Sequence, residues 1–344
     1  MTIVCLYSDH NGCDYHRVLL PMQYLPLQMG DQIKVINYNA LITDDRVFAC
    51  DVLFFSRTCL YGLDKVLALK EKYGFKLVVD IDDYHQLYYH HYLYQYWQQK
   101  DMSNKIIAFC RAADLVFVTN EQLYNVYREF NSHVHILPNA LPFDDVEPFI
   151  SKRTPSIKTR FMYIAGSSHL ADLKLLNGLF RRLDTDQDFK HKAEFVLCGY
   201  NNPTPVKNIW DQMEAICRIG GAYTRRETLP LDNYLEHYNY GDVAIAPLED
   251  NLFNTCKSNL KYIEAGLMKA PFICTDVLPY TVDKEAKGIK FCKNTSEWYA
   301  AFKFFANNKA AVEDYGQANY EYVKRMYNLV EVNKLRYNLF KSLT

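Results

Sequence analysis

Three charged side chains in the second half of the chain lie at helical spacing. Lys257, Lys261 and Glu264 are four and three positions apart, so a helix predicted over Lys257–Lys269 would carry them on one face. A helix start offers free backbone N–H groups and the positive end of its dipole, so Lys257 and Ser258 beside it would form a phosphate site. Glu264 lies two turns further along, where a carboxylate can accept hydrogen bonds from ribose hydroxyls. A solvated face of mixed charges is the simpler interpretation of this triplet.

Acidic side chains end a predicted strand in the first half. Asp82 and Asp83 follow the apolar strand Lys76–Asp80, and three acids within four positions do not suit a buried core. One hypothesis is contact with a substrate, which makes Asp82 and Asp83 candidate catalytic residues. A magnesium site is the second hypothesis, because hard cations take carboxylate oxygens. A local turn is the third, and we expect no metal.

An aromatic segment, Tyr84–Trp97, follows these acids and contains six Tyr, three His and one Trp. Aromatic faces stack on sugar rings and on unstacked nucleobases, so Tyr84, His85 and Tyr88 are candidate acceptor-binding residues. The simpler interpretation is an amphipathic helix that buries tyrosine rings and keeps their hydroxyl groups in water. Arg17 is a further acceptor-binding candidate, unless it serves a contact within the fold.

Two glycine-containing turns follow predicted strands. Gly12 comes after the first strand, and Gly166-Ser167 precedes a helix in the second half, where backbone N–H groups can face a phosphate. His169 would add a hydrogen-bond donor, so Gly166, Ser167 and His169 are candidate phosphate-binding residues. Asp172 has an ordinary interpretation as a first-turn acid of the helix, which we favour.

Short apolar runs alternate with segments of helical length along the chain, which indicates parallel sheets covered on both faces. In the first half the predicted strands are Thr2–Tyr7, Ile33–Tyr38, Val52–Ser56, Lys76–Asp80, Leu115–Thr119 and Val134–Leu137. In the second half the predicted strands are Phe161–Ala165, Glu194–Cys198, Val243–Ala246 and Phe272–Cys274, and the predicted helices include Leu170–Leu183 and Val206–Arg218. The predicted fold is α/β, with two Rossmann-like doubly wound domains that bind ligands at the carboxyl ends of their strands.

A polar stretch from Pro142 to Pro155 separates the two series of strands and is predicted as a linker. The predicted domains are residues 1–150 and 151–310, followed by helices in 311–344. With two domains, the cleft between them is the expected site.

Composition narrows the class of protein. The 344 residues include 28 Tyr and 20 Phe, which excludes a disordered chain, and the net charge of −1 gives no strong basic face. No apolar run approaches the ~20 residues that a bilayer requires, and the first residues lack a signal-peptide pattern. The ten cysteines form no C-x-x-C pair, so we expect buried thiols in a reducing compartment and no structural metal.

The segment Glu264–Ile273 resembles the E-A-x-x-x-G-x-P-V-I stretch of family 4-like glycosyltransferases, which have the GT-B fold. Further segments resemble that family in the same order along the chain. They are Asn11-Gly12 at its glycine-rich donor loop, Ala113–Thr119 at its A-D-x-V-x-x-x-S strand, Pro138-Asn139-Ala140 at its I-P-N-G-V segment and Tyr240–Pro247 at its A-D-v-x-v-x-P-S element. The resemblance covers nearly the whole chain at low identity.

The resemblance implies two domains that face each other across a cleft, with C-terminal helices that pack back on the first domain. Residues 1–150 would form the acceptor side and 151–310 the nucleotide-sugar donor side, where Glu264 would bind the ribose. The expected enzyme is a hexosyl- or pentosyltransferase that uses a nucleotide sugar, retains the anomeric configuration and needs no metal or other cofactor. Lys257 would stabilise the leaving diphosphate.

Two departures from the family concern the donor. Cys256 stands where the family has an acid that contacts the donor sugar, and the Arg and Lys that usually grip the diphosphate are missing after Ala165. We therefore expect sugar recognition to differ and Lys257 to carry most of the cationic charge. A GT-B-fold nucleotide-sugar epimerase and a non-catalytic nucleotide-sugar binder are alternative functions.

The acceptor is the second open choice. The motif Asp80-Ile81-Asp82-Asp83 resembles a branch of GT-B proteins from phage and bacterial genomes. A glycan or related saccharide is the first hypothesis. The alternative is a phage-type DNA glycosyltransferase that acts on hydroxylated or hydroxymethylated pyrimidines, because the aromatic segment could stack on a flipped base. In either case we expect a cytoplasmic protein of a bacterial cell or a phage-infected host.

Overall fold

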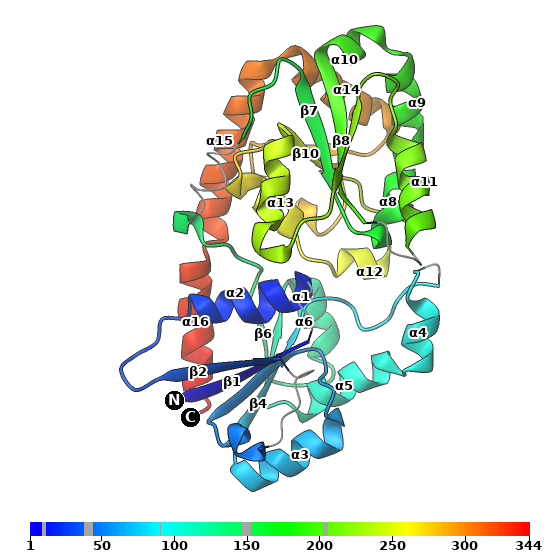
Figure 1. Ribbon diagram of the computed structural model, residues 1–344. Coiled ribbons are helices and arrows are strands. Elements are labelled where there is room, and N and C mark those ends of the chain that lie inside the picture. The colour runs from blue at the N-terminus through cyan, green and yellow to red at the C-terminus, as the bar shows by residue number, and fades with distance from the viewer. Residues whose placement is uncertain (9–11, 38–43, 90, 146–152, 202–205) are drawn as a thin grey trace. The chain divides into compact units, whose positions relative to one another are not determined.

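The computed structural model describes residues 1–8, 12–37, 44–89, 91–145, 153–201 and 206–344 (Figure 1). The chain forms two compact units. Unit 1 comprises Met1–Pro142, Thr255–Ser258 and Tyr327–Thr344, and unit 2 comprises Phe143–Asn254 and Asn259–Met326. Residues 146–152 of the predicted linker lie outside the described residues, as does Asn11 of the predicted donor loop.

Unit 1 is built on a parallel sheet with the strand order β2-β1-β3-β4-β5-β6. The strands are β1 (Thr2–Tyr7), β2 (Gln32–Asn37), β3 (Val52–Ser56), β4 (Lys76–Ile81), β5 (Leu115–Val118) and β6 (Val134–Ile136). The order reverses between β1 and β3, and doubly wound sheets bind ligands beside that point, at the carboxyl ends of the strands. The residues that follow β1, β3 and β4 are therefore placed for chemistry.

Helices cover both faces of this sheet. The helical elements of unit 1 are α1 (Gly12–Asp14), η1 (Tyr15–Leu19), α2 (Leu20–Gln23), η2 (Asp45–Phe48), α3 (Gly62–Tyr73), α4 (Tyr94–Gln99), α5 (Met102–Ala112), α6 (Glu121–Tyr127) and α16 (Leu329–Lys341). Alternate residues of β3 enter two different core clusters, Leu53 and Phe55 on one face and Val52 and Phe54 on the other. Phe340 of α16 packs on Phe54 with ring centres 5.5 Å apart, so the last helix of the chain belongs to the core of unit 1.

Unit 2 repeats this architecture with the strand order β12-β11-β10-β7-β8-β9, again parallel throughout. The strands are β7 (Thr159–Ile164), β8 (Ala193–Tyr200), β9 (Tyr223–Glu227), β10 (Val243–Ala246), β11 (Phe272–Thr275) and β12 (Ile289–Cys292). The order reverses between β7 and β10, which marks the carboxyl ends of these strands as the ligand edge. Phe161 of β7 stacks on Phe302 at 4.2 Å in the main core cluster.

The helical elements of unit 2 are η3 (Phe143–Asp145), η4 (Ser167–His169), α8 (Leu170–Lys174), α9 (Asn177–Thr185), α10 (Gln187–Lys192), α11 (Lys207–Cys217), η5 (Leu231–Tyr240), α12 (Leu252–Thr255, whose last residue belongs to unit 1), α13 (Leu260–Leu267), η6 (Tyr280–Asp283), α14 (Thr295–Asn307) and α15 (Lys309–Met326). Within the described ranges, no helix combines the length and the apolar character needed to span a bilayer.

Three predicted helices differ from the structure. The helix predicted over Lys257–Lys269 begins only at Leu260, and the helix predicted over Leu170–Leu183 is divided into α8 and α9. In the segment Tyr84–Trp97, the described residues before Tyr94 form no helix. The two strands β9 and β12 were not predicted. Both lie at sheet edges, and the exposed Arg225–Glu227 stretch of β9 lacks the apolar run that identifies a buried strand.

Candidate active site

Four side chains meet at the carboxyl ends of β1, β3 and β4 in unit 1. Cys13 lies in α1 after β1, Arg57 directly follows β3, and Asp82 and Asp83 follow β4. Nε of Arg57 donates to Oδ1 of Asp82 at 2.7 Å. Nη2 of Arg57 donates to Oδ2 of Asp83 at 2.9 Å and contacts Sγ of Cys13 at 3.2 Å. The structure thus brings the two predicted acids together around one guanidinium group.

Arg57 adopts a backbone conformation that side chains other than glycine rarely take, with φ at 57°. Its amide donates to the carbonyl of Asp80 at 2.8 Å, which holds this conformation. Backbone strain of this kind is found where a side chain must be aimed at a site. Arg57 was not among the predicted site residues, although its position directly after a buried strand was a usable signal.

The charge of Arg57 decides the protonation of Asp82. Burial raises the pKa of Asp82, but the Arg57 charge and hydrogen bonds from Cys13 and Arg57 outweigh burial and hold this pKa below its usual range. Burial raises the pKa of the Cys13 thiol well above its ordinary value. At neutral pH the group is therefore an ionised acid and a neutral thiol beside a cation.

The same group was tested as a metal site. Ligand atoms of Cys13, Asp82 and Asp83 lie within 4.8 Å of one another. However, the Arg57 guanidinium contacts all three of them, so a divalent ion would have to displace a cation that is already hydrogen-bonded there. This donor set suits an ion-pair network better than a metal.

Lys257 belongs to this site of unit 1. Its Nζ lies 3.8 Å from Oδ1 of Asp83. Nδ2 of Asn120 donates to the carbonyls of Cys256 and Lys257 at 2.9 and 3.0 Å, and Nδ2 of Asn139 donates to Oγ of Ser258 at 2.8 Å. These bonds, together with the burial of Cys256 in the unit 1 core, hold residues 255–258 as a short anchored segment.

The predicted helical face of Lys257, Lys261 and Glu264 is wrong for this reason. Lys257 precedes α13 and is assigned to unit 1, whereas Lys261 and Glu264 belong to unit 2. Ser258 likewise precedes the helix instead of forming its first turn. The periodicity of three charges could not reveal that Asn120 and Asn139, more than a hundred residues earlier, hold this segment.

Arg17 has a structural role. Its side chain is 1% exposed and bonds both carboxylate oxygens of Asp80 at 2.8 and 2.9 Å. Nη1 donates to Oδ1 of Asn139 at 2.9 Å and Nη2 to the carbonyl of Leu137 at 2.9 Å. Because every guanidinium nitrogen of Arg17 is used within the fold, the expected contact with an acceptor is not supported.

The predicted aromatic residues divide into buried and accessible ones. His85 is 5% exposed, packs beside Tyr84 and Tyr127, and has its pKa lowered by burial, so it serves the core and not an acceptor. Tyr84 also packs against the core cluster, and Tyr88 lies edge-on to His91 at 5.5 Å. The most exposed rings are other tyrosines of this segment and of α4, namely Tyr89, Tyr92 and Tyr96.

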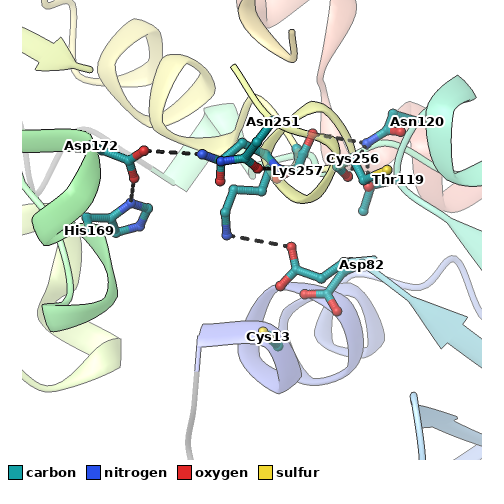
Figure 2. A network of polar contacts seen from close by, with 12 residues as sticks. Cys13, Asp82, Thr119, Asn120, His169, Asp172, Asn251, Cys256 and Lys257 are labelled. Atoms are coloured by element: carbon teal, nitrogen blue, oxygen red, sulfur yellow. Dashed lines mark hydrogen bonds and ion pairs between the residues drawn. The ribbon is translucent and has the colours of Figure 1, made fainter. Parts of the chain in front are cut away.

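In unit 2, the turn after β7 carries Gly166, Ser167 and His169. Nδ1 of His169 lies 2.7 Å from Oδ2 of Asp172 (Figure 2). Oδ1 of the same buried carboxylate accepts the amide N–H of Glu249 at 2.8 Å and Nδ2 of Asn254 at 3.2 Å. Asp172 is therefore more than a first-turn acid, because it fixes the His169 ring and ties α8 to the segment after β10.

Glu264 lies at the same edge of the unit 2 sheet. It is 2% exposed, and Oε2 accepts the Tyr238 hydroxyl at 2.9 Å. Nζ of Lys261, one turn earlier, donates at 3.0 Å to the carbonyl of Ile164, the last residue of β7. Burial raises the pKa of Glu264 to about 7, against the opposing effects of Lys261 and Tyr238. Glu264 can thus exchange a proton or accept hydroxyl hydrogen bonds near neutral pH.

No protein-family model matches the chain, and no curated protein matches its sequence. Solved structures resemble its fold. Sucrose-phosphate synthase from Thermosynechococcus elongatus has a TM-score of 0.66 at 13% identity over 100% of this chain and 99% of that chain. HepE from Anabaena in complex with UDP-glucose has a TM-score of 0.69 at 10% identity. The similarity covers 99% of this chain and 100% of HepE. TarM has a TM-score of 0.60 at 14% identity over 84% of this chain and 54% of its own, so the present chain spans about half the length of TarM.

A putative UDP-N-acetylglucosamine 2-epimerase from Listeria monocytogenes is also similar, with a TM-score of 0.58 at 10% identity over 97% of this chain and 94% of that one. At these identities the similarities establish the fold. The predicted α/β fold of the GT-B type is confirmed by the two parallel six-stranded sheets and by these structures.

Proposed function

We propose that this protein is a glycosyltransferase that moves a sugar from a nucleotide sugar to an acceptor hydroxyl. The observation that carries the proposal is the pair of polar groups at the carboxyl edge of the unit 2 sheet. Glu264 is a buried carboxylate suited to ribose hydroxyls, and the Gly166–His169 turn offers donors to a diphosphate. HepE of the same fold was solved with UDP-glucose, which makes a uridine nucleotide the first candidate donor.

In this proposal the residues of unit 1 act on the leaving group and the sugar. The acceptor oxygen forms a bond to the anomeric carbon, the bond from that carbon to the diphosphate breaks, and its electron pair stays on the phosphate oxygen. That oxygen takes the acceptor proton, so no side-chain nucleophile is needed and the configuration is retained. Lys257 stabilises the developing charge, and Asp82 and Asp83 accept hydrogen bonds from sugar hydroxyls. The transfer needs no metal or other cofactor.

The proposed acceptor is a saccharide. Tyr89, Tyr92 and Tyr96 expose about half or more of their surface, with values of 71%, 49% and 53%. Rings of this kind stack on sugar faces and keep a hydroxyl for hydrogen bonding. These tyrosines replace the buried His85 as the candidate acceptor contacts.

The test is calorimetry with UDP, UDP-glucose and other nucleotide sugars, followed by mass spectrometry with mixed saccharide acceptors. We expect one nucleotide sugar to bind and Glu264→Ala to weaken its binding, while the matched surface variant Glu227→Ala, on the exposed β9, leaves it unchanged. Absence of binding by every nucleotide would contradict the enzyme proposal.

An epimerase is the second candidate, favoured by the similarity to the Listeria protein. Proton NMR of the bound nucleotide sugar without acceptor separates the two activities. Conversion into a second nucleotide sugar without acceptor supports the epimerase, and a sugar adduct on the acceptor supports the transferase.

A further inference from the structure

A second concave site lies in unit 2, at the edge of the sheet opposite Glu264. It is a cavity of about 540 Å³. Its lining includes Thr159, the first residue of β7, and Asp242, which directly precedes β10. The amino ends of parallel strands share one edge, whereas Glu264 lies beside the carboxyl end of β7. The cavity is therefore separate from the proposed nucleotide site and has the size of a pocket for a small molecule.

Three cationic side chains line this cavity, namely Arg153, Lys269 and Lys309. Nη2 of Arg153 donates to the carbonyl of Met268 at 2.5 Å, while its Nε is buried and has no partner among the described residues. Burial lowers the pKa of Arg153, which shows that its charge is poorly compensated. An anion in the cavity would add negative charge beside this guanidinium group.

Asp242 supplies only part of that compensation, because its charge raises the pKa of Arg153 less than burial lowers it. Both of its carboxylate oxygens are bonded by Arg160, at 2.9 and 3.1 Å, and the Arg160 amide donates to the same carboxylate at 2.8 Å. The negative charge of Asp242 is thus already matched by another arginine. Arg153 therefore keeps part of its positive charge uncompensated beside the cavity.

Lys269 is the most informative of the three cations. It follows the last turn of α13 with φ at 52°, in the left-handed region where helices usually end on glycine. The E-A-x-x-x-G-x-P-V-I pattern has its glycine at this position. Gly316 of α15 packs so closely on the Lys269 carbonyl that a Cβ there would lie 2.2 Å from the oxygen, which fixes this backbone. Nζ of Lys269 lies 4.9 Å from the centre of the Tyr320 ring, and the side chain lines the cavity.

The start of α15 also lines the cavity, and it carries Lys309 together with polar and acidic side chains. Glu313, Asp314 and Gln317 line the cavity there, and the two acids are exposed. Carboxylate and amide oxygens accept hydrogen bonds from hydroxyl groups. We propose that this cavity binds a phosphorylated sugar, with the phosphate at Arg153 and Lys269 and the sugar hydroxyls at Glu313, Asp314 and Gln317 of α15.

The test is calorimetry on the full chain with glucose 6-phosphate, inorganic phosphate and glucose. We expect glucose 6-phosphate to bind more tightly than inorganic phosphate, and glucose to give no signal. Lys269→Gly should weaken glucose 6-phosphate binding about tenfold or more, because one charged hydrogen bond is lost. Its Tm should be equal to or above that of the unchanged protein, because glycine adopts this conformation without strain. Arg153→Gln should weaken binding by a similar factor.

Lys207→Ala is the matched control, since it removes the same charge from the exposed first residue of α11. It should change the affinity less than twofold. The proposal is overturned if glucose 6-phosphate does not bind, if Lys269→Gly binds it unchanged, if Lys207→Ala weakens it equally, or if inorganic phosphate binds as tightly. None of these measurements depends on sugar transfer, so the outcome is independent of the proposed function.

Discussion

At the scale of single residues, the chemistry proposed for unit 1 depends on Lys257. The Asp83 carboxylate 3.8 Å away and the two asparagine anchors hold its ammonium group near the acids. In the transferase proposal it meets charge that develops only as the diphosphate leaves. A preorganised partner of this kind affects the chemical step more than substrate binding.

We therefore expect Lys257→Ala to lower kcat by about 10²–10³-fold. The KM for the nucleotide sugar should rise by a much smaller factor. Steady-state kinetics with the donor identified by calorimetry measure both, and Lys207→Ala serves as the charge-matched control. A Lys257→Ala enzyme with unchanged kcat would remove Lys257 from the mechanism.

Glu264 gives a prediction for stability against pH. Its pKa is about 7 in the folded chain and 4.5 in the reference state, so between these values the folded state holds a proton that the unfolded state has lost. Stability therefore falls as the pH rises through this window, by roughly 3 kcal/mol for a shift of this size. Below pH 4.5 both states are protonated and the contribution of Glu264 vanishes.

Glu264→Gln keeps the acceptor for Tyr238 and abolishes this titration. The variant should be more stable than the unchanged protein at pH 8 by roughly 3 kcal/mol and equally stable at pH 4. Urea unfolding at the two pH values measures the difference in unfolding free energy between the two proteins. The contributions of the other titrating groups cancel in this difference. A constant difference between the two proteins at both pH values would show that Glu264 titrates normally.

At the scale of elements, the segment of residues 255–258 connects distant parts of the sequence. Asn120 also caps α6, because its Oδ1 accepts the Leu123 amide at 3.0 Å. Asn120→Asp keeps this acceptor but loses both donors to the 256 and 257 carbonyls. This substitution therefore releases the segment while the cap of the helix remains.

If the segment serves to place Lys257, the effects of Asn120→Asp and Lys257→Ala on kcat cannot be additive. Asn120→Asp should lower kcat about tenfold in the unchanged protein and less than about twofold when Lys257 is already alanine. A double-mutant cycle in kcat measures this coupling, with Tm recorded for each protein. Equal effects in both backgrounds would mean that Asn120 supports only the stability of the fold.

The elements also show what the sequence could reveal. Most of the ten predicted strands were recognisable because their apolar runs are buried on both faces, as β3 is at every position, whereas the edge strand β2 is largely exposed. The start of α13 at Leu260 was not, because Asn139 and the burial of Cys256 hold the preceding residues by contacts remote in sequence. Arg57 was missed for the same reason: its three partners follow two other strands.

At the scale of the whole molecule, each unit is assembled from separate stretches of the chain. Residues 255–258 return to unit 1 in the middle of unit 2, and the residues from Tyr327 onward return to unit 1 again. Boundaries predicted as continuous ranges, such as 151–310, cannot represent this pattern. Composition and periodicity identify elements, but the unit to which a short segment belongs depends on its tertiary contacts.

Net charge leads to the last prediction, which concerns the acceptor. The chain carries 39 basic and 40 acidic residues, whereas proteins that hold DNA neutralise several phosphates with a clustered basic surface. The site of unit 1 itself contains Asp82 and Asp83 beside Lys257 and Arg57, so it offers little excess positive charge to a polyanion. We expect no gel shift with hydroxymethylated duplex DNA even at low salt, and transfer of sugar to a saccharide in the same preparation. A shift that weakens steeply between low and moderate salt, together with sugar incorporated into the DNA, would instead establish DNA as the acceptor, because counterion release makes phosphate contacts sensitive to salt.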